Sequence, residues 1–332
     1  MNITFLLGNG FDIGLGLKSG YKSFYPYFVD KANDDNLIRQ AIEKEKKDNY
    51  STWADLEEAL GRFTHNISLD QRQKFVQDKV EVDTLLKEYL LSEEEKFDLS
   101  KEKIKEIMTN AIKHIRQGNN LEEKELIKSV LNGHVSEDFW YQCITFNYTN
   151  CIDKIWSSIS EEIVGSHTYG GRTKMERFDR VLHIHGTLSD NEMLIGVNDE
   201  TQIDNKEILE DETVRWSLIK PYLNKVLGQR KIESAQKIID QSGIICLYGM
   251  SIGKTDNIWW EYIGNWLRTQ SSNVLIIYNY DPQYILGHPV NQLIHSEKIR
   301  ESFLDKTKLD EHNRKLIKDK IIIYDNQNIF SV

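Results

Sequence analysis

The chain has 332 residues, 39% of them hydrophobic, and its 42 basic and 52 acidic residues give a net charge of −10. This length allows one large domain or two smaller ones, and the acidic balance argues against broad binding to a nucleic-acid backbone. We expect a cytoplasmic protein without a membrane anchor, for three reasons. The chain has three scattered cysteines (Cys143, Cys151 and Cys246), it shows no signal peptide, and it has no apolar stretch near the ~18 residues of a membrane span.

The first predicted element is a buried strand, Ile3–Leu7, which ends at the loop 8–12. A glycine turn after the first strand of a parallel sheet is typical of nucleotide-binding loops, because the backbone can approach a phosphate closely. The fingerprint is incomplete, since Ile13 stands where G-x-G-x-x-G has its third glycine, and the Asp12 carboxylate would repel a pyrophosphate. An ordinary glycine turn is the alternative. The predicted ligand contacts of this loop are Gly8, Asn9, Gly10 and Phe11.

Residues 21–138 are rich in Lys and Glu and carry almost no strand signal. Apolar residues share one helical face in two places: Leu56, Ala59, Leu60 and Phe63, then Ile104, Ile107, Met108, Ala111, Ile112 and Ile115. We therefore predict a helical insertion over 21–138, with 1–20 and 139–332 forming one sheet domain. Trp53 is expected to anchor the helix that follows it, and Glu57 rather than Asp55 is expected to face the cleft.

Six further apolar runs predict strands, several of them continuous, as in strands buried on both faces of a parallel sheet. They are Tyr141–Phe146, Val181–His185, Met193–Val197, Ile244–Tyr248, Val274–Tyr278 and Ile321–Tyr324. Helical patterns over Tyr222–Asp240 and Asn257–Arg268 alternate with them. The alternation predicts an α/β fold with a mostly parallel, Rossmann-type sheet.

Polar residues close two of these runs, where an open parallel sheet binds its ligands. Asn147 follows the second strand, and its amide can donate to and accept from a ribose, although asparagine also forms turns and caps helices. His183 and His185 stand two apart before Gly186 and are expected on one face of a strand. They fit a metal pair, or a general base at His185 with His183 as its structural partner, beside a space opened by the glycine; a hydrogen-bonded structural histidine is the alternative. His183 is also among the predicted nucleotide-binding residues.

The segment Gly249-Met250-Ser251-Ile252-Gly253 follows another strand and matches G-x-S-x-G. A Ser251 nucleophile would need a later histidine, and His288, His295 and His312 do not close an obvious strand. We favour a second nucleotide-contact loop containing Gly249 and Ser251. Asp256 either caps the next helix or lines the site, and Asp281 is placed to hold a ribose.

Together these motifs resemble the bacterial abortive-infection AbiH family. The resemblance rests on Gly8-Asn9-Gly10-Phe11-Asp12, Trp53-Ala54-Asp55-Leu56-Glu57, Phe146-Asn147-Tyr148-Thr149, His183-Ile184-His185-Gly186 and Gly249-Met250-Ser251 with Asp256. That family is in turn similar to sirtuin-like, NAD-binding folds. The resemblance implies phage defence and cleavage of NAD, with Gly8 and Gly10 at the dinucleotide, Asn147 near the ribose and His185 as base. Asn9 and Asp12 depart from the usual sirtuin loop, and there are no zinc-binding cysteines.

The function predicted from the sequence is therefore an antiphage effector that hydrolyses the N-glycosidic bond of NAD or a related nucleotide. Asp12, Asn147 and His185 are the predicted catalytic residues, and NAD is expected as substrate or ligand, with no bound cofactor or metal. A homo-oligomer or a defence-system partner protein is also expected. Two alternatives stay open: a metal-dependent nuclease-type toxin, and a non-catalytic nucleotide sensor that acts through a partner.

Overall fold

The protein is described by a computed structural model that covers residues 1–48, 56–159, 163–190, 193–228, 230–282, 284 and 288–330. One seven-stranded sheet crosses these residues in the order β3-β4-β2-β1-β5-β6-β7. Only β3 and β4 pair antiparallel, and every other neighbouring pair is parallel. The strands are β1 (Asn2–Leu7), β2 (Phe139–Thr145), β3 (Ile163–Tyr169), β4 (Arg172–His183), β5 (Ser242–Tyr248), β6 (Val274–Asn279) and β7 (Ile321–Asp325). The predicted α/β class with a mostly parallel sheet is confirmed.

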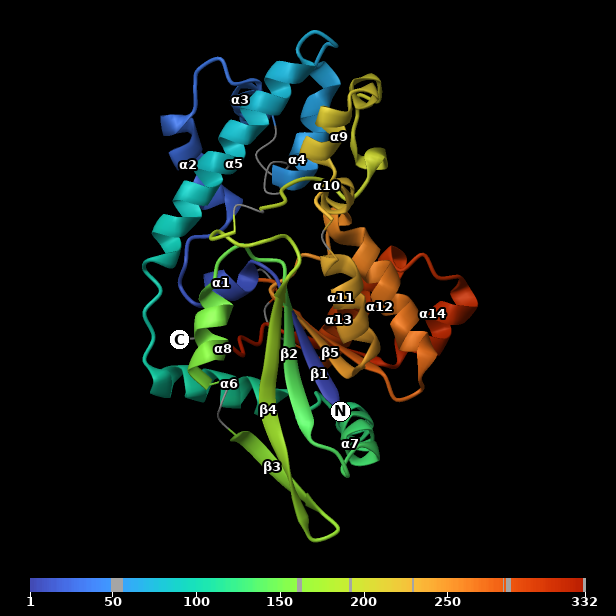
Figure 1. The fold of residues 1–332 in the computed structure, drawn as a ribbon. Coiled ribbons are helices and arrows are strands. Elements are labelled where there is room, and N and C mark those ends of the chain that lie inside the picture. The colour runs from blue at the N-terminus through green and yellow to red at the C-terminus, as the bar shows by residue number, and fades with distance from the viewer. Residues whose placement is uncertain are drawn as a thin grey trace.

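Helices cover both faces of this sheet and also stand over its carboxyl-terminal edge (Figure 1). They are α1 (Gly10–Gly14), α2 (Tyr21–Lys31), α3 (Leu37–Asp48), α4 (Leu56–Phe63), α5 (Arg72–Glu94), α6 (Lys101–Ile115), α7 (Leu121–Gly133), α8 (Cys151–Ile159), α9 (Glu212–Leu218), α10 (Lys220–Val226), α11 (Lys231–Asp240), α12 (Asn257–Thr269), α13 (Pro289–Lys306) and α14 (Glu311–Lys318).

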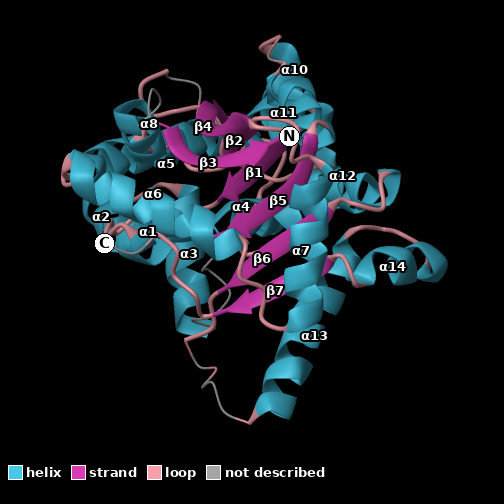
Figure 2. Cartoon of the chain, turned by 90° about the horizontal axis from the view of Figure 1, so that it is seen from below, coloured by secondary structure: helices cyan, strands magenta, loops and turns pink. Residues whose placement is uncertain are grey.

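The two faces of the sheet have separate apolar cores, because successive side chains of a strand point to opposite sides. Ile3, Phe5 and Leu7 of β1 pack in a cluster with α6, α7 and α8, whereas Leu6 packs in a second cluster with α11 to α14. Figure 2 shows the strands as a layer between these two groups of helices. Near-continuous apolar strands are therefore required, as the sequence indicated.

A third apolar cluster lies over the carboxyl-terminal ends of the strands and is built from two distant parts of the chain. Residues from α2 to α5 pack there against residues 188–219 (Figure 1). We call this layer, the described residues of 21–94 with those of 188–219, the cap. The described residues between β1 and β2 form helices and no strand, while α6 and α7 pack on the sheet rather than in the cap. The predicted division of the chain at residues 20 and 138 stays a prediction.

Three predicted elements differ from the structure, and one strand was not predicted. The predicted strand Val181–His185 is only the end of β4, which begins at Arg172 and ends at His183. Met193–Val197 is not a strand: it crosses the cap, and its one bridge pairs Val197 with Ile219. The predicted helix Tyr222–Asp240 is interrupted between α10 and α11, where Gly228 has a φ of +66°. β3 was not predicted, because its residues are half-buried or exposed and carry no apolar run. None of the helices in the described ranges has an apolar stretch long enough for a bilayer crossing.

Candidate functional site

A cavity of about 380 Å³ lies beyond the carboxyl ends of β1, β2 and β5, beneath the cap. The chain runs from β1 to β2 on one side and later returns to β5 on the other, so β1 and β5 flank the point where the strand order reverses. Open α/β sheets bind ligands at such a switch point. Its lining comes from the loops after these strands and from the cap: Gly8, Asn9, Asp12, Ser19, Tyr21, Glu57, Leu86, Leu90, Phe146, Asn147, Tyr148, Thr149, His185, Gly249, Met250, Ser251, Ile252, Gly253, Thr255, Asp256 and Trp260.

The glycines of the first loop allow the loops after β1 and β5 to pack closely against each other. A Cβ on Gly10 would lie 2.5 Å from Gly249 Cα, and a Cβ on Gly8 would lie 2.7 Å from Gly249 O. The Gly8 and Gly10 amides donate to Tyr248 O and Gly249 O, and the Phe11 amide donates to Gly8 O. The expected cradle of amides around a phosphate is therefore corrected, because these three amides are already bonded within the protein.

Asp12 is the most deeply buried acid of the cavity. Its Oδ1 accepts from Asn147 Nδ2 at 3.0 Å and its Oδ2 accepts from Thr149 Oγ1 at 2.7 Å. Burial raises the pKa of Asp12 to about 6, although Thr149 and Asn147 favour the charged form. A carboxyl that titrates near neutral pH at a cavity wall is typical of a functional group.

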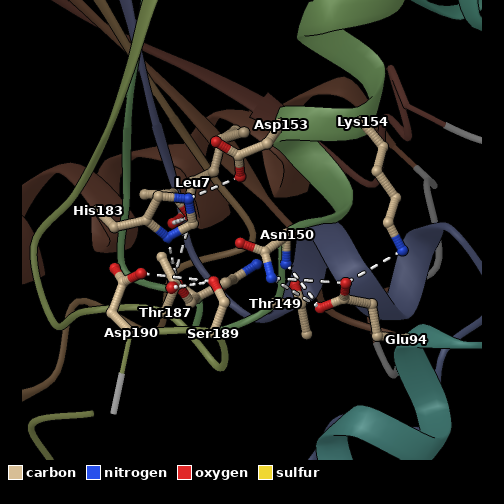
Figure 3. A network of polar contacts seen from close by, with 12 residues as sticks. Leu7, Glu94, Thr149, Asn150, Asp153, Lys154, His183, Thr187, Ser189 and Asp190 are labelled. Atoms are coloured by element: carbon tan, nitrogen blue, oxygen red, sulfur yellow. Dashed lines mark hydrogen bonds and ion pairs between the residues drawn. The ribbon is translucent and has the colours of Figure 1, made fainter. Parts of the chain in front are cut away.

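His183 holds the backbone at Asn147, and Figure 3 shows it beside Asp153. Its Nδ1 faces the carbonyl oxygen of Asn147 at 3.1 Å, and its Nε2 lies 2.7 Å from Asp153 Oδ2 on α8. Figure 3 also shows Glu94 of the cap accepting from the Asn150 amide and contacting Lys154. His183 thus fixes the backbone at Asn147 and does not line the cavity.

A second polar cluster joins the sheet to the cap through Lys220, at the start of α10. Lys220 Nζ lies 2.8 Å from Glu57 Oε2 on α4 and 3.0 Å from Asp256 Oδ1. Burial opposes the charged ammonium, but Asp256 and Glu57 outweigh it and raise the pKa of Lys220. Burial likewise opposes charge on Asp256, and Lys220 nevertheless holds the pKa of that carboxyl well below its usual range. The pair is therefore ionised at neutral pH.

His185 belongs to this second cluster. Its Nε2 lies 3.2 Å from Asp256 Oδ1, and Lys220 Nζ lies 3.5 Å away. Burial and the Lys220 charge lower the pKa of His185 to about 4, so the imidazole is neutral at pH 7. A histidine that serves as general base works best with a pKa near the working pH, and the pKa of His185 lies well below it. Nε2 carries the proton toward Asp256, because that contact is shorter and charge-assisted.

The two predicted histidines therefore face different partners. His183 ends β4, whereas His185 lies beyond it, so the spacing rule for one strand face does not apply. Within the described ranges no group of three or more His, Cys, Asp or Glu side chains is placed to hold a metal ion.

Eight of the predicted site residues line the cavity: Gly8, Asn9, Asp12, Asn147, His185, Gly249, Ser251 and Asp256. Gly10 is taken up by the contact with Gly249, and Phe11 is fully buried with its ring 5.1 Å from that of Phe330. Asp281 follows β6, and its amide donates to Asn326 Oδ1 outside the cavity. Asp256 makes no side-chain cap bond to α12, so of its two predicted roles the structure favours the cavity.

The loop after β5 differs from a nucleophile elbow. In that motif the serine itself occupies the strained turn. Here the positive φ values belong to Gly249, at +67°, and to Ile252, at +50°, and not to Ser251. A β-branched residue in this region is strained, and such strain gathers at ligand sites.

Sequence reasoning missed Lys220, Tyr148 and Thr149 as site residues. Tyr148 OH donates to Glu57 Oε1 at 3.0 Å and thereby links the loop after β2 to the cap. Tyr148 and Thr149 directly follow Asn147, so their position in the sequence could have assigned them to the site. Lys220 is an isolated lysine, and nothing in the sequence around it indicated a role in the site. Glu57 lines the cavity as predicted from its helical phase. Trp53 and Asp55 lie outside the described residues.

Comparison with known proteins gives one family match. A family model described as "Bacteriophage abortive infection AbiH" matches residues 4–278, a range that contains every residue lining the cavity. Among curated proteins no relative matches the chain.

The loop contact predicts that Gly10→Ala lowers the free energy of unfolding by about 1–3 kcal/mol, because the new Cβ overlaps the Gly249 backbone. Gly133→Ala is the matched control, since a Cβ there meets no atom within 4 Å. Denaturant unfolding of both variants measures the difference. Equal stability of Gly10→Ala and the parent would contradict the tight contact.

The raised pKa of Asp12 predicts a pH-dependent gain in stability for Asp12→Asn. The folded state holds the Asp12 proton up to pH about 6 and the unfolded state only to about 3.8, so this group destabilises the protein increasingly as pH rises through that window. The shift corresponds to about 3 kcal/mol. We expect Asp12→Asn to melt higher than the parent at pH 7.5 and no higher at pH 4, because the amide still accepts from Asn147 and Thr149 can turn its hydroxyl.

Asp325→Asn is the control for this measurement. Asp325 also ends a strand, is 4% exposed and accepts from two side chains, Asn279 and Ser296, but it lies outside the cavity. A lower melting temperature for Asp12→Asn at pH 7.5 would show that the Asp12 charge is structural.

The Lys220 cluster predicts that Lys220→Met costs about 3–5 kcal/mol at pH 7.5, because two carboxylates lose their buried cation. Adding Glu57→Gln should recover part of the loss, because it removes one of the two carboxylates left without a cation. Denaturant titrations of the single and double variants measure both effects. A loss below about 1 kcal/mol for Lys220→Met would count against the ion-pair bridge.

Proposed function

Because the family model spans residues 4–278 of its 332 residues, this protein belongs to the bacteriophage abortive infection AbiH family, and we propose that its cavity hydrolyses an N-glycosidic bond of NAD or a related nucleotide. Membership of the family indicates a role in abortive infection. The chemistry within that role is our proposal, and it rests on the cavity at the switch point of the sheet.

The buried Asp12 carboxyl carries the proposal. When nicotinamide leaves NAD⁺ it departs as a neutral molecule, and positive charge develops on the ribose as an oxocarbenium-like centre. A buried carboxylate that is held in place stabilises such charge without reorganising, as in glycosidases. Asp12 fits this role because Asn147 and Thr149 fix both of its oxygens while it lines the cavity.

The proton balance also favours Asp12. Water attacks the ribose C1′ and must lose a proton, while the leaving nicotinamide needs none. A base works best when its pKa lies near the working pH. The pKa of Asp12 is about 6 and that of His185 about 4, so we assign proton acceptance to Asp12 rather than to His185. Asn147 then orients the ribose or the water, and His185 shapes the cavity wall beside Asp256.

The donor set of the cavity supports a glycosidic reaction over a metal-dependent nuclease. Both oxygens of Asp12 accept hydrogen bonds, and both oxygens of Glu57 are bonded, to Tyr148 and Lys220. In the part of the chain that the structure describes, no group of three or more His, Cys, Asp or Glu side chains stands here to complete a metal site. The sensor alternative shares the cavity and differs only in leaving the nucleotide intact.

The test is incubation of the purified protein with NAD⁺, with and without a chelator, followed by chromatography of nicotinamide and ADP-ribose. We expect both products in equal amounts and no effect of the chelator. Asp12→Asn should lower the rate at least about 100-fold with NAD binding retained, and Asn147→Ala at least about tenfold, because both act on the transition state. Asp325→Asn should keep the parental rate.

Three outcomes would contradict the proposal. Intact NAD that binds the parent would favour the sensor. Metal-dependent cleavage of nucleic acid would favour the nuclease. A parental rate in Asp12→Asn would remove the assigned residue.

A further inference from the structure

A second cavity, of about 250 Å³, lies at the other end of the sheet from the first. Phe139, the first residue of β2, and Glu176, its register partner in β4, form one side. Arg116 after α6, five residues of α7 and Val135 form the other side, and His167 of β3 closes it. None of these residues contributes to the cavity beneath the cap.

The base of this second cavity is apolar. Ile127 and Phe139 are nearly fully buried, and the half-buried Leu131 and Val135 complete the surface. The His167 ring lies over the Phe139 ring, with centroids 4.4 Å apart, and its Nε2 is 3.1 Å from the carbonyl oxygen of Val135. These contacts hold the wall in place and make a slot that suits a flat or extended apolar group.

A fixed cation stands beside this apolar surface. Arg116 Nη2 donates to Glu176 Oε2 at 2.7 Å, and Tyr141 OH donates to the same oxygen at 2.8 Å. Glu176 and Tyr141 are buried, so they anchor the guanidinium while its side chain stays 40% exposed. A guanidinium has five N–H donors, and these contacts use Nη2, which leaves the others for a ligand.

The charge of the cavity is opposite to that of the chain. Its lining has three cationic side chains, Arg116, Lys124 and Lys128, and one carboxylate, Glu176, in a protein of net charge −10. Glu176 is already neutralised by Arg116. Lys128 contacts Glu125 at 3.4 Å on the surface, and Lys124 has no ion pair within the described part of the chain. This excess of positive charge in the lining favours the binding of an anion.

We propose that this cavity binds a small organic anion with an apolar body, such as an aryl or alkyl carboxylate. The carboxylate lies between Arg116 and Lys124, and the apolar body rests on Ile127, Leu131 and Phe139. The site is separate from the proposed hydrolytic cavity, so neither proposal depends on the other.

Calorimetric titration of the full chain with 3-phenylpropionate tests the proposal. Matched probes are 3-phenylpropanamide, which keeps the shape and lacks the charge, and acetate, which keeps the charge and lacks the body. We expect a dissociation constant below about 1 mM for 3-phenylpropionate, at least tenfold weaker binding of either matched probe, and weakening with salt.

Variants assign the binding to this cavity. Lys124→Gln should weaken it at least about fivefold, and Leu131→Trp should abolish it by filling the space, with Val135→Trp as a second filling variant if the first fails to fold. Lys113→Gln, on exposed surface of α6 outside the cavity, should bind as the parent does. Equal affinity for the acid and its amide, no binding by the parent, or parental affinity in a folded filling variant would overturn the proposal.

Discussion

The architecture of the cavity depends on the two ion pairs of the buried Lys220 ammonium. The ammonium lies between Glu57 of the cap and Asp256, which follows β5. Each of these carboxylates would be unfavourable in a buried position without a cation, so the three side chains have to come together. Their meeting sets the distance between cap and sheet, and the distance defines the cavity. Tyr148 adds a fourth element by donating to Glu57.

The floor of the cavity follows a different rule, which is steric. Gly8, Gly10 and Gly249 let the loops after β1 and β5 touch through their backbones, and the amides bond across the gap. This close contact brings Asp12 beneath the end of β2, where Asn147 and Thr149 reach it. The glycine pattern that suggests a phosphate-binding loop thus forms a pocket that contains a carboxyl group. The Gly8 and Gly10 amides are hydrogen-bonded to the end of β5 and the loop after it.

The sheet was largely predictable because its buried strands are apolar runs that need no context. The predicted bounds of β1, β2, β5, β6 and β7 lie within two residues of the observed bounds at each end. β3 was not predicted, since this exposed edge strand has no apolar run. Met193–Val197 was wrongly predicted as a strand, because residues of the cap are as apolar as those of the strands. At the site, Asp12, Asn147, His185 and Asp256 were found from their places at strand ends. Lys220 was not, because its role exists only through partners 163 and 36 positions away.

The cap draws on residues 21–94 and 188–219, and its link to the sheet needs Asp256. During synthesis the first segment therefore emerges long before the second, with apolar side chains that have no partner yet. Long-range pairing of this kind makes folding slow and exposes unfinished intermediates. A chain that ends before Asp256 lacks the carboxylate that joins Lys220 to the sheet, so its pocket is incomplete. The pocket is therefore assembled only after the greater part of the polypeptide has been made.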